Sequence, residues 1–79
     1  MLQYSNDVFC EKLKKARKAR NLTQVQASEL LGIKRNTYAR YETGHAEPCH
    51  KVLFDISKLY KVSIDDLFDP DPEKLKFKR

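Results

Sequence analysis

Two short segments with helical periodicity, each followed by a glycine, place the strongest constraint on how this chain can fold. The first covers about 23–31 and is followed by Gly32, and the second covers about 34–43 and is followed by Gly44. Glycine readily takes the positive φ at which many helices end, and Thr23 is a residue type that caps the start of a helix well. The pattern therefore predicts two short helices joined by a tight turn.

The apolar residues of these segments recur at the i, i+3 and i+4 spacing that places side chains on one face of a helix. Each helix is therefore expected to pack that face against a common core. The residues expected to face inward are Ala27, Leu30 and Leu31 in the first helix, Ile33 in the turn, and Tyr38, Ala39 and Tyr41 in the second helix. The tyrosines are interpreted as core aromatic residues rather than as surfaces on which bases stack.

The remaining face of the second helix is polar and basic. It carries Arg35, Asn36, Thr37 and Arg40. Arginine suits the edge of a guanine and asparagine that of an adenine, and each good pair discriminates against other bases by about 1–3 kcal/mol. This face therefore has the chemistry of a DNA major-groove reader, although a polar helix face can also be simply solvated.

The arrangement resembles the helix-turn-helix of the Cro/phage-repressor (XRE) family. The matching residues are Leu22-Thr23-Gln24, Leu31-Gly32-Ile33, Thr37-Tyr38 and Tyr41-Glu42-x-Gly44, within a wider resemblance from about Val8 to Phe68. The chain departs from the family at Ala27-Ser28, where Leu-Ala is usual. The resemblance implies an all-α, five-helix lambda-repressor-like domain over residues 1–69. A basic tail over 70–79, flexible or associated with a dimer, follows it.

The resemblance also implies roles for individual residues. The implied base-contacting residues are Arg35, Asn36, Thr37 and Arg40. The implied phosphate-contacting residues are Thr23, Gln24, Lys34, Gly44 and His45. Arg17 and Glu42 are implied to form a structural ion pair that locks an earlier helix against the second motif helix. The unpaired N–H groups at a helix start independently favour a phosphate near Gln24.

Three further helices are expected, at about 7–20, 49–60 and 62–68. The first is expected to turn inward Phe9, Leu13, Ala16 and one of Arg17 or Arg20. Its outer side is expected to carry Lys12, Lys14, Lys15 and Lys18, either as a solvated face or with a phosphate contact near its C-terminal end.

The last two helices are expected to complete the core. The 49–60 helix should turn inward Val52, Leu53, Ile56, Leu59 and Tyr60. His50 is expected to be semi-buried, and Phe54 to point partly outward as a candidate dimer contact. In the final helix Ser63 and Asp66 form a capping-box-like pair. The residues expected to close the core or a dimer surface there are Ile64, Leu67 and Phe68.

Charge is distributed unevenly along the chain. The net charge is +5; residues 1–45 hold nine Lys/Arg against four Asp/Glu, whereas residues 46–79 hold seven of each. The positive excess therefore lies on the half that contains the motif, which suits a polyanionic partner. Basic helices are also simply soluble, so charge alone does not separate these two interpretations.

Other features limit the class of protein. No apolar run approaches the roughly 20 residues that span a bilayer, and residues 1–10 lack the apolar region of a signal peptide. A cytoplasmic protein without a membrane partner is therefore expected. Cys10 and Cys49 are not accompanied by a second pair of ligands at metal spacing. No metal site and no cofactor are expected, and the thiols are interpreted as structural or free in a reducing compartment.

The leading hypothesis is a sequence-specific transcriptional regulator that binds double-stranded DNA through the 34–43 helix. A repressor bound to a palindromic operator as a homodimer is favoured, because two-fold protein symmetry matches two half-sites. The alternative is a protein-interaction module, antitoxin-like or an adaptor, that keeps the fold without reading DNA. An enzyme is not expected. The chain shows no nucleophile beside a base, no carboxylate pair in a pocket and no phosphate-binding loop.

Overall fold

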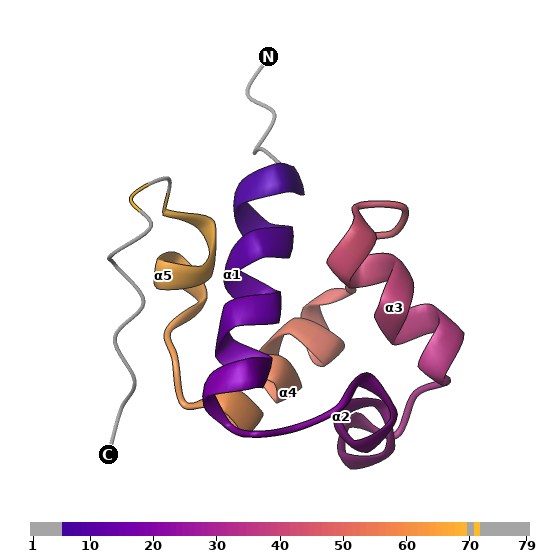
Figure 1. The fold of residues 1–79 in the computed structure, drawn as a ribbon. Helices are drawn as coiled ribbons and strands as arrows, with labels where there is room; N and C mark the ends of the chain where they lie inside the picture. The colour runs from indigo at the N-terminus through magenta and orange to yellow at the C-terminus, as the bar shows by residue number, and fades with distance from the viewer. Residues whose placement is uncertain (1–5, 70, 72–79) are drawn as a thin grey trace.

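Five α-helices connected by short turns make up the described part of the chain, residues 6–69 and residue 71 of a computed structural model. The helices are α1 (Asn6–Ala19), α2 (Gln24–Leu31), α3 (Arg35–Thr43), α4 (His50–Tyr60) and α5 (Ile64–Phe68) (Figure 1). The predicted all-α fold is confirmed, and α2 and α3 are the two motif helices. Apart from Asp71, the predicted basic tail over 70–79 lies outside the described residues.

Local backbone chemistry sets the ends of the motif helices as predicted. The Thr23 hydroxyl accepts a hydrogen bond from the Gln26 N–H at 3.1 Å, and Gln26 Oε1 accepts one from the Thr23 N–H at 2.9 Å. This reciprocal capping box satisfies two N–H groups at the start of α2. Gly32 and Gly44 end α2 and α3 with φ of 71° and 82°, which residues with a Cβ avoid.

The helices enclose one core, and α1 is the central helix of the arrangement (Figure 1). α1 packs against α3 on one side and α5 on the other, and α2 packs against both α3 and α4. In the view of Figure 1, α2 is seen nearly end-on while α3 runs obliquely beside it, so the motif helices cross steeply. This crossing leaves one long side of α3 on the outside of the molecule.

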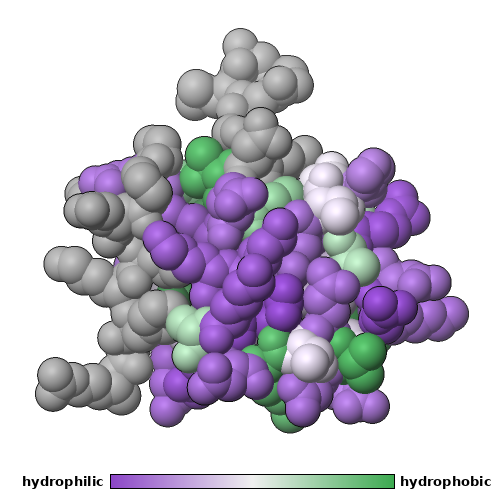
Figure 2. Space-filling model, in the orientation of Figure 1, coloured by the Kyte–Doolittle hydropathy of each residue, from purple (hydrophilic) through white to green (hydrophobic). Residues whose placement is uncertain are grey.

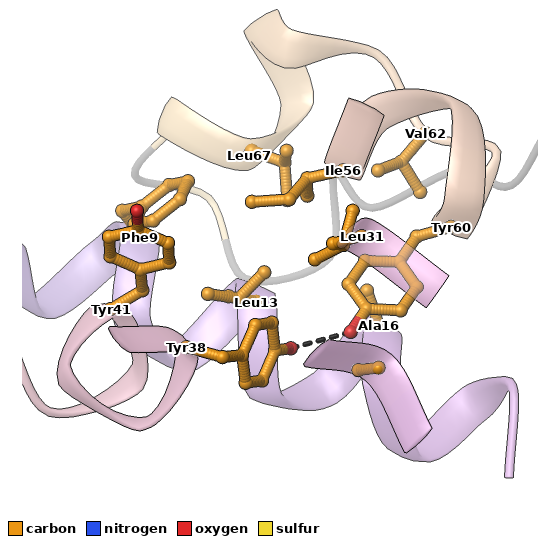
Figure 3. Close-up of a cluster of buried hydrophobic side chains, with 11 residues drawn as sticks. Phe9, Leu13, Ala16, Leu31, Tyr38, Tyr41, Ile56, Tyr60, Val62 and Leu67 are labelled. Carbon is orange, nitrogen blue, oxygen red and sulfur yellow. Dashed lines mark hydrogen bonds between the residues drawn. The ribbon is translucent and has the colours of Figure 1, made fainter. Parts of the chain in front are cut away.

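The core combines aliphatic residues with three buried tyrosines (Figure 3). Its members are Phe9, Leu13, Ala16, Ala27, Leu31, Tyr38, Tyr41, Ile56, Tyr60, Val62 and Leu67. Tyr38 and Tyr41 are therefore core residues, as predicted. The hydroxyls of Tyr38 and Tyr60 lie 2.5 Å apart in a buried hydrogen bond. The ring of Phe68 stacks on that of Phe9 with 4.9 Å between the ring centroids, which fixes α5 against α1.

Two predicted inward-facing residues are in fact exposed. Leu30 is 63% exposed. The buried side of α2 is formed by Ala27, Ser28 and Leu31, and Leu30 lies about 100° around the helix from Leu31. His50 was predicted to be semi-buried and is exposed, because it is the first residue of α4 and faces away from the core.

The prediction for Lys12 was wrong in the opposite sense, because a residue expected to be exposed is buried. It was placed on the outer side of the first helix, but it is only 3% exposed. Its ammonium group donates a hydrogen bond to the Asp66 backbone oxygen at 2.7 Å. Because α5 packs along this side of α1, the aliphatic stem of Lys12 is covered while its charge reaches a carbonyl group near the end of α5.

Candidate nucleic-acid interface

α3 has a buried side and an exposed side, and two of the predicted base-contacting residues lie on the exposed one. The buried side consists of Tyr38, Tyr41 and Glu42. Asn36 and Arg40 lie one turn apart, opposite that side, and both are exposed. Thr37 is half-buried on one flank, and Arg35 is exposed in the first turn on the other flank. Two of the four predicted residues, Asn36 and Arg40, thus lie on the outer side of α3, and the other two lie on its flanks.

The predicted phosphate-contacting residues lie at helix ends beside this surface. Thr23 is the exposed N-cap of α2, and Gln24 is its half-buried first residue. Lys34 is the exposed N-cap of α3, and its side chain makes no capping hydrogen bond. Neither helix has an acidic residue in its first turn. Both helix starts therefore keep the positive end of the helix dipole unneutralised, which favours a nearby anion.

Arg17 and Glu42 form the ion pair that the resemblance implied. Arg17 Nε lies 2.7 Å from Glu42 Oε2, and Arg17 Nη2 donates to Glu42 Oε1 at 3.3 Å. Arg17 Nη1 donates to the Leu22 backbone oxygen at 2.8 Å, and Gln24 Nε2 donates to Glu42 Oε1 at 3.1 Å. One carboxylate of α3 is therefore bonded to both α1 and α2, and one guanidinium also fixes the loop between them.

The ionisation of Glu42 reflects this environment. Burial alone would raise the pKa of its carboxyl group. Hydrogen bonds from Arg17, Gln24 and Tyr38 outweigh burial and hold that pKa below its usual value. The Glu42 hydrogen bond in turn raises the pKa of the Arg17 guanidinium. Both groups are thus charged at neutral pH, and the first turn of α2 is tied to the last turn of α3.

A second set of hydrogen bonds closes the C-terminal end of α3. Arg40 Nη2 donates to the His45 backbone oxygen at 3.3 Å. A hydrogen bond of 2.8 Å joins Thr43 Oγ1 and His45 Nδ1. These side chains are exposed, and Gly44 between them is half-buried. Arg40 is therefore linked to the loop that follows α3, next to the predicted phosphate contacts at Gly44 and His45.

Sequence reasoning missed three residues that shape this region. Gln26 completes the capping box of α2 and was detectable, since it stands three residues after Thr23. Thr43 bonds to His45 across the end of α3. Tyr60 bonds to Tyr38 from α4, a contact between residues 22 positions apart that no local pattern indicates.

The surface over α1 and α3 is largely hydrophilic (Figure 2). Lys14, Lys15 and Lys18 lie along the outer side of α1, together with Glu11. Among the described residues, no helix has both the length and the apolar character needed to cross a membrane. Nor do these residues include a group of three or more His, Cys, Asp or Glu side chains that could hold a metal ion.

Known proteins share this arrangement. A helix-turn-helix family model matches residues 13–67. YqaE of Bacillus subtilis, an uncharacterized HTH-type transcriptional regulator, is 47% identical over 60 residues, covering 76% of this chain and 52% of YqaE. The cryptic phage CTXphi transcriptional repressor RstR of Vibrio cholerae is 39% identical over 57 residues, covering 72% of this chain and 51% of RstR. This chain spans about half the length of the curated relatives it matches.

A solved structure agrees with the sequence matches. The crystal structure of a transcriptional regulator from Listeria innocua superposes with a TM-score of 0.72 at 30% identity, covering 85% of this chain and 60% of that one. The family match includes both motif helices, the turn between them and the Glu42 that ties α3 to its neighbours. The chain therefore belongs to the XRE-type helix-turn-helix family.

Proposed function

We propose that this chain is a sequence-specific regulator of transcription that binds double-stranded DNA by inserting α3 into the major groove. The observation that carries this proposal is the division of α3 into two sides. Buried Tyr38 and Glu42 anchor one side, while Asn36 and Arg40 are exposed on the other. Direct readout needs this combination, because donors must meet base edges from a backbone that does not move.

Within this proposal, two groups of residues have different tasks. The base-contacting residues are Arg35, Asn36, Thr37 and Arg40. The phosphate-contacting residues are Thr23, Gln24, Lys34, Gly44 and His45. Phosphate contacts orient a protein on the duplex without reading its sequence, and base contacts supply the discrimination. The proposed DNA-binding domain comprises residues 1–69, and the predicted basic tail over 70–79 lies, apart from Asp71, outside the described residues.

The proposal further assigns a repressor that occupies a palindromic operator as a homodimer. The relative RstR is named as a transcriptional repressor, which supports repression rather than activation. Phe54 projects from α4 and is exposed, so it is available for contact with a second copy. Two copies related by a two-fold axis would present two α3 helices to half-sites about one helical turn apart.

Selection of bound duplexes from a random DNA pool tests the DNA-reading proposal. The affinity of the selected duplex is then measured at several salt concentrations. We expect a two-fold symmetric motif and a steep loss of affinity with salt, since phosphate neutralisation releases counterions. A selected motif without two-fold symmetry would contradict the homodimer. Placing the selected motif over a reporter promoter tests repression. Higher reporter expression with the protein than without it would show activation and contradict repression.

The exposed apolar residues favour one second candidate, a protein-interaction module. Leu30 on α2 and Phe54 on α4 are both large and exposed, and such residues can contribute to protein interfaces. Under this alternative, selection from the random pool enriches no motif, and only weak, salt-sensitive binding to any duplex is seen. Replacement of Arg35 and Asn36 together by alanine would then leave that binding equally weak for every sequence.

A further inference from the structure

Two buried hydroxyl groups connect α3 to the helix behind it. Tyr38 on α3 and Tyr60 on α4 are both fully buried, and their hydroxyl oxygens lie 2.5 Å apart. Figure 3 shows the two rings approaching from different helices and meeting only at their tips. Burial raises the pKa of Tyr60 to about 12 and that of Tyr38 further above its usual value, so both hydroxyls keep their protons.

This bond is one of several polar attachments on the inward side of α3, which also include the hydrogen bond from Cys10 Sγ to the Tyr41 backbone oxygen at 3.2 Å. Glu42 follows Tyr38 by four residues and so lies one turn further along the same side. It is bonded to Arg17 of α1 and Gln24 of α2. Polar groups therefore attach the inner side of α3 to α1, α2 and α4. The attachments at Tyr38 and Glu42 are one helical turn apart along α3.

Polar attachments restrict a helix in a way that apolar contacts do not. Apolar packing is tolerant of small shifts and substitutions of similar volume, whereas a hydrogen bond weakens steeply when its angle or length changes. If α3 rotated or slid within the core, the hydrogen bond between the Tyr38 and Tyr60 hydroxyls would break while both groups stayed buried. Breaking a hydrogen bond between buried groups is unfavourable. The pair therefore selects one rotation of α3.

We propose that Tyr38 and Tyr60 are positioning residues for DNA reading, whose paired hydroxyls hold the exposed side of α3 in one rotation relative to the rest of the domain. This inference rests on the proposed function and goes beyond it. It gives a role in operator selectivity to Tyr60, a buried residue on α4 that cannot touch DNA. The role is exerted entirely through α3.

The test compares tyrosine-to-phenylalanine variants, which remove one hydroxyl and keep the ring. Tyr38→Phe and Tyr60→Phe break the pair. Tyr41→Phe is the matched control, because Tyr41 is also buried on α3 but its hydroxyl makes no hydrogen bond within the part of the chain that the structure describes. The measured quantity is selectivity, defined as the affinity for the selected operator divided by the affinity for a random duplex, at a temperature where every variant is folded.

Each of Tyr38→Phe and Tyr60→Phe is expected to lower selectivity about three- to tenfold, the fold-change that corresponds to one neutral hydrogen bond. The double variant should lose little more than Tyr38→Phe alone, which removes the shared bond together with the Tyr38 hydrogen bond to Glu42. Tyr41→Phe should keep the selectivity of the unaltered chain. A purely structural role would lower the melting temperature and leave selectivity unchanged, and that result would overturn the proposal.

Amide hydrogen exchange on the free protein separates this inference from the proposed function. Tyr60→Phe should speed exchange in α3 more than in α5, because α3 loses an attachment and α5 does not. Tyr41→Phe should leave the ratio of the α3 rate to the α5 rate unchanged. If no operator is selected, the proposed function fails, and so does the role in selectivity. If an operator is selected but exchange in α3 does not change, the positioning inference alone is wrong.

Discussion

Replacing Glu42 with glutamine tests how strongly the ion pair holds α3 in place. The Glu42 side chain is 1% exposed and that of Arg17 is 13% exposed. Glutamine keeps the shape of the side chain but removes the charge that faces the guanidinium. Breaking one partner of a buried pair costs roughly 3–5 kcal/mol, because the other charge stays buried without compensation. Arg17 keeps its bond to the Leu22 oxygen, so we expect about 3 kcal/mol.

Urea unfolding followed by circular dichroism at pH 7 measures this loss. The expected loss is large, because a domain of this size has a free energy of unfolding of roughly 4–12 kcal/mol. Asp55→Asn is the matched control. It breaks the Lys51–Asp55 pair of 3.1 Å, whose side chains are 83% and 35% exposed, and should cost no more than about 0.5 kcal/mol. Equal losses in the two variants would refute the argument from burial.

Replacing both partners distinguishes an unpaired charge from lost packing. Arg17→Met combined with Glu42→Leu removes both charges and fills the site with apolar groups of similar size. Such replacements of buried pairs are often neutral or stabilising, so the double variant should be clearly more stable than Glu42→Gln. A double variant as unstable as Glu42→Gln would mean that shape, and not the unpaired Arg17 charge, determines the loss.

The same pair predicts a pH dependence with a defined sign. The pKa of Glu42 is lower in the folded chain than its ordinary value of 4.5. The unfolded state therefore binds the proton more readily, and the stability that Glu42 contributes is complete above about pH 5 and declines as pH falls through the folded pKa. Urea unfolding of both proteins between pH 7 and pH 3 should show the gap between the unaltered chain and Glu42→Gln narrowing below about pH 4.5. A constant gap would contradict the lowered pKa.

Three further substitutions test the interface and a helix end. Arg35→Ala should cost about 1–3 kcal/mol on the selected operator and relax specificity at one base position, and an equal loss on random duplexes would remove its base-reading role. Gln24→Ala should weaken binding to all sequences alike, as a phosphate contact does, so a sequence-selective loss would reassign it. Thr23→Ala should lower the free energy of unfolding, measured without DNA, by about 1 kcal/mol through loss of the α2 cap; an unchanged value would show that the capping box contributes nothing.

Helix ends could be predicted because their energetics are local. Thr23 caps α2 through atoms three residues away, and Gly32 and Gly44 end their helices through their own backbone conformation. Asn21, which follows α1, takes the left-handed conformation with φ of 57°, and asparagine tolerates this conformation better than most residues. A pattern read over a few neighbouring residues contains all that these features depend on.

Of the polar contacts that hold α3, the ion pair was predicted and the tyrosine hydrogen bond was not. The Arg17–Glu42 pair was reached through the family resemblance and not through spacing alone, since its partners stand 25 residues apart. The bond between Tyr38 and Tyr60 was not anticipated. Both residues were assigned to the core, but a sequence does not indicate where a hydroxyl group points once its ring is buried.

The sequence by itself determined that the chain forms short helices with two glycine-ended segments at its centre, and that the outer side of one of them is basic. Tertiary structure alone decided which side of each helix is covered. Leu30 is exposed and Lys12 is buried, against the apolar pattern in both cases. The reason is that α1 packs mainly against α3 and α5, and α2 mainly against α3 and α4. The directions of those contacts depend on the crossing of distant helices and not on the periodicity of either helix.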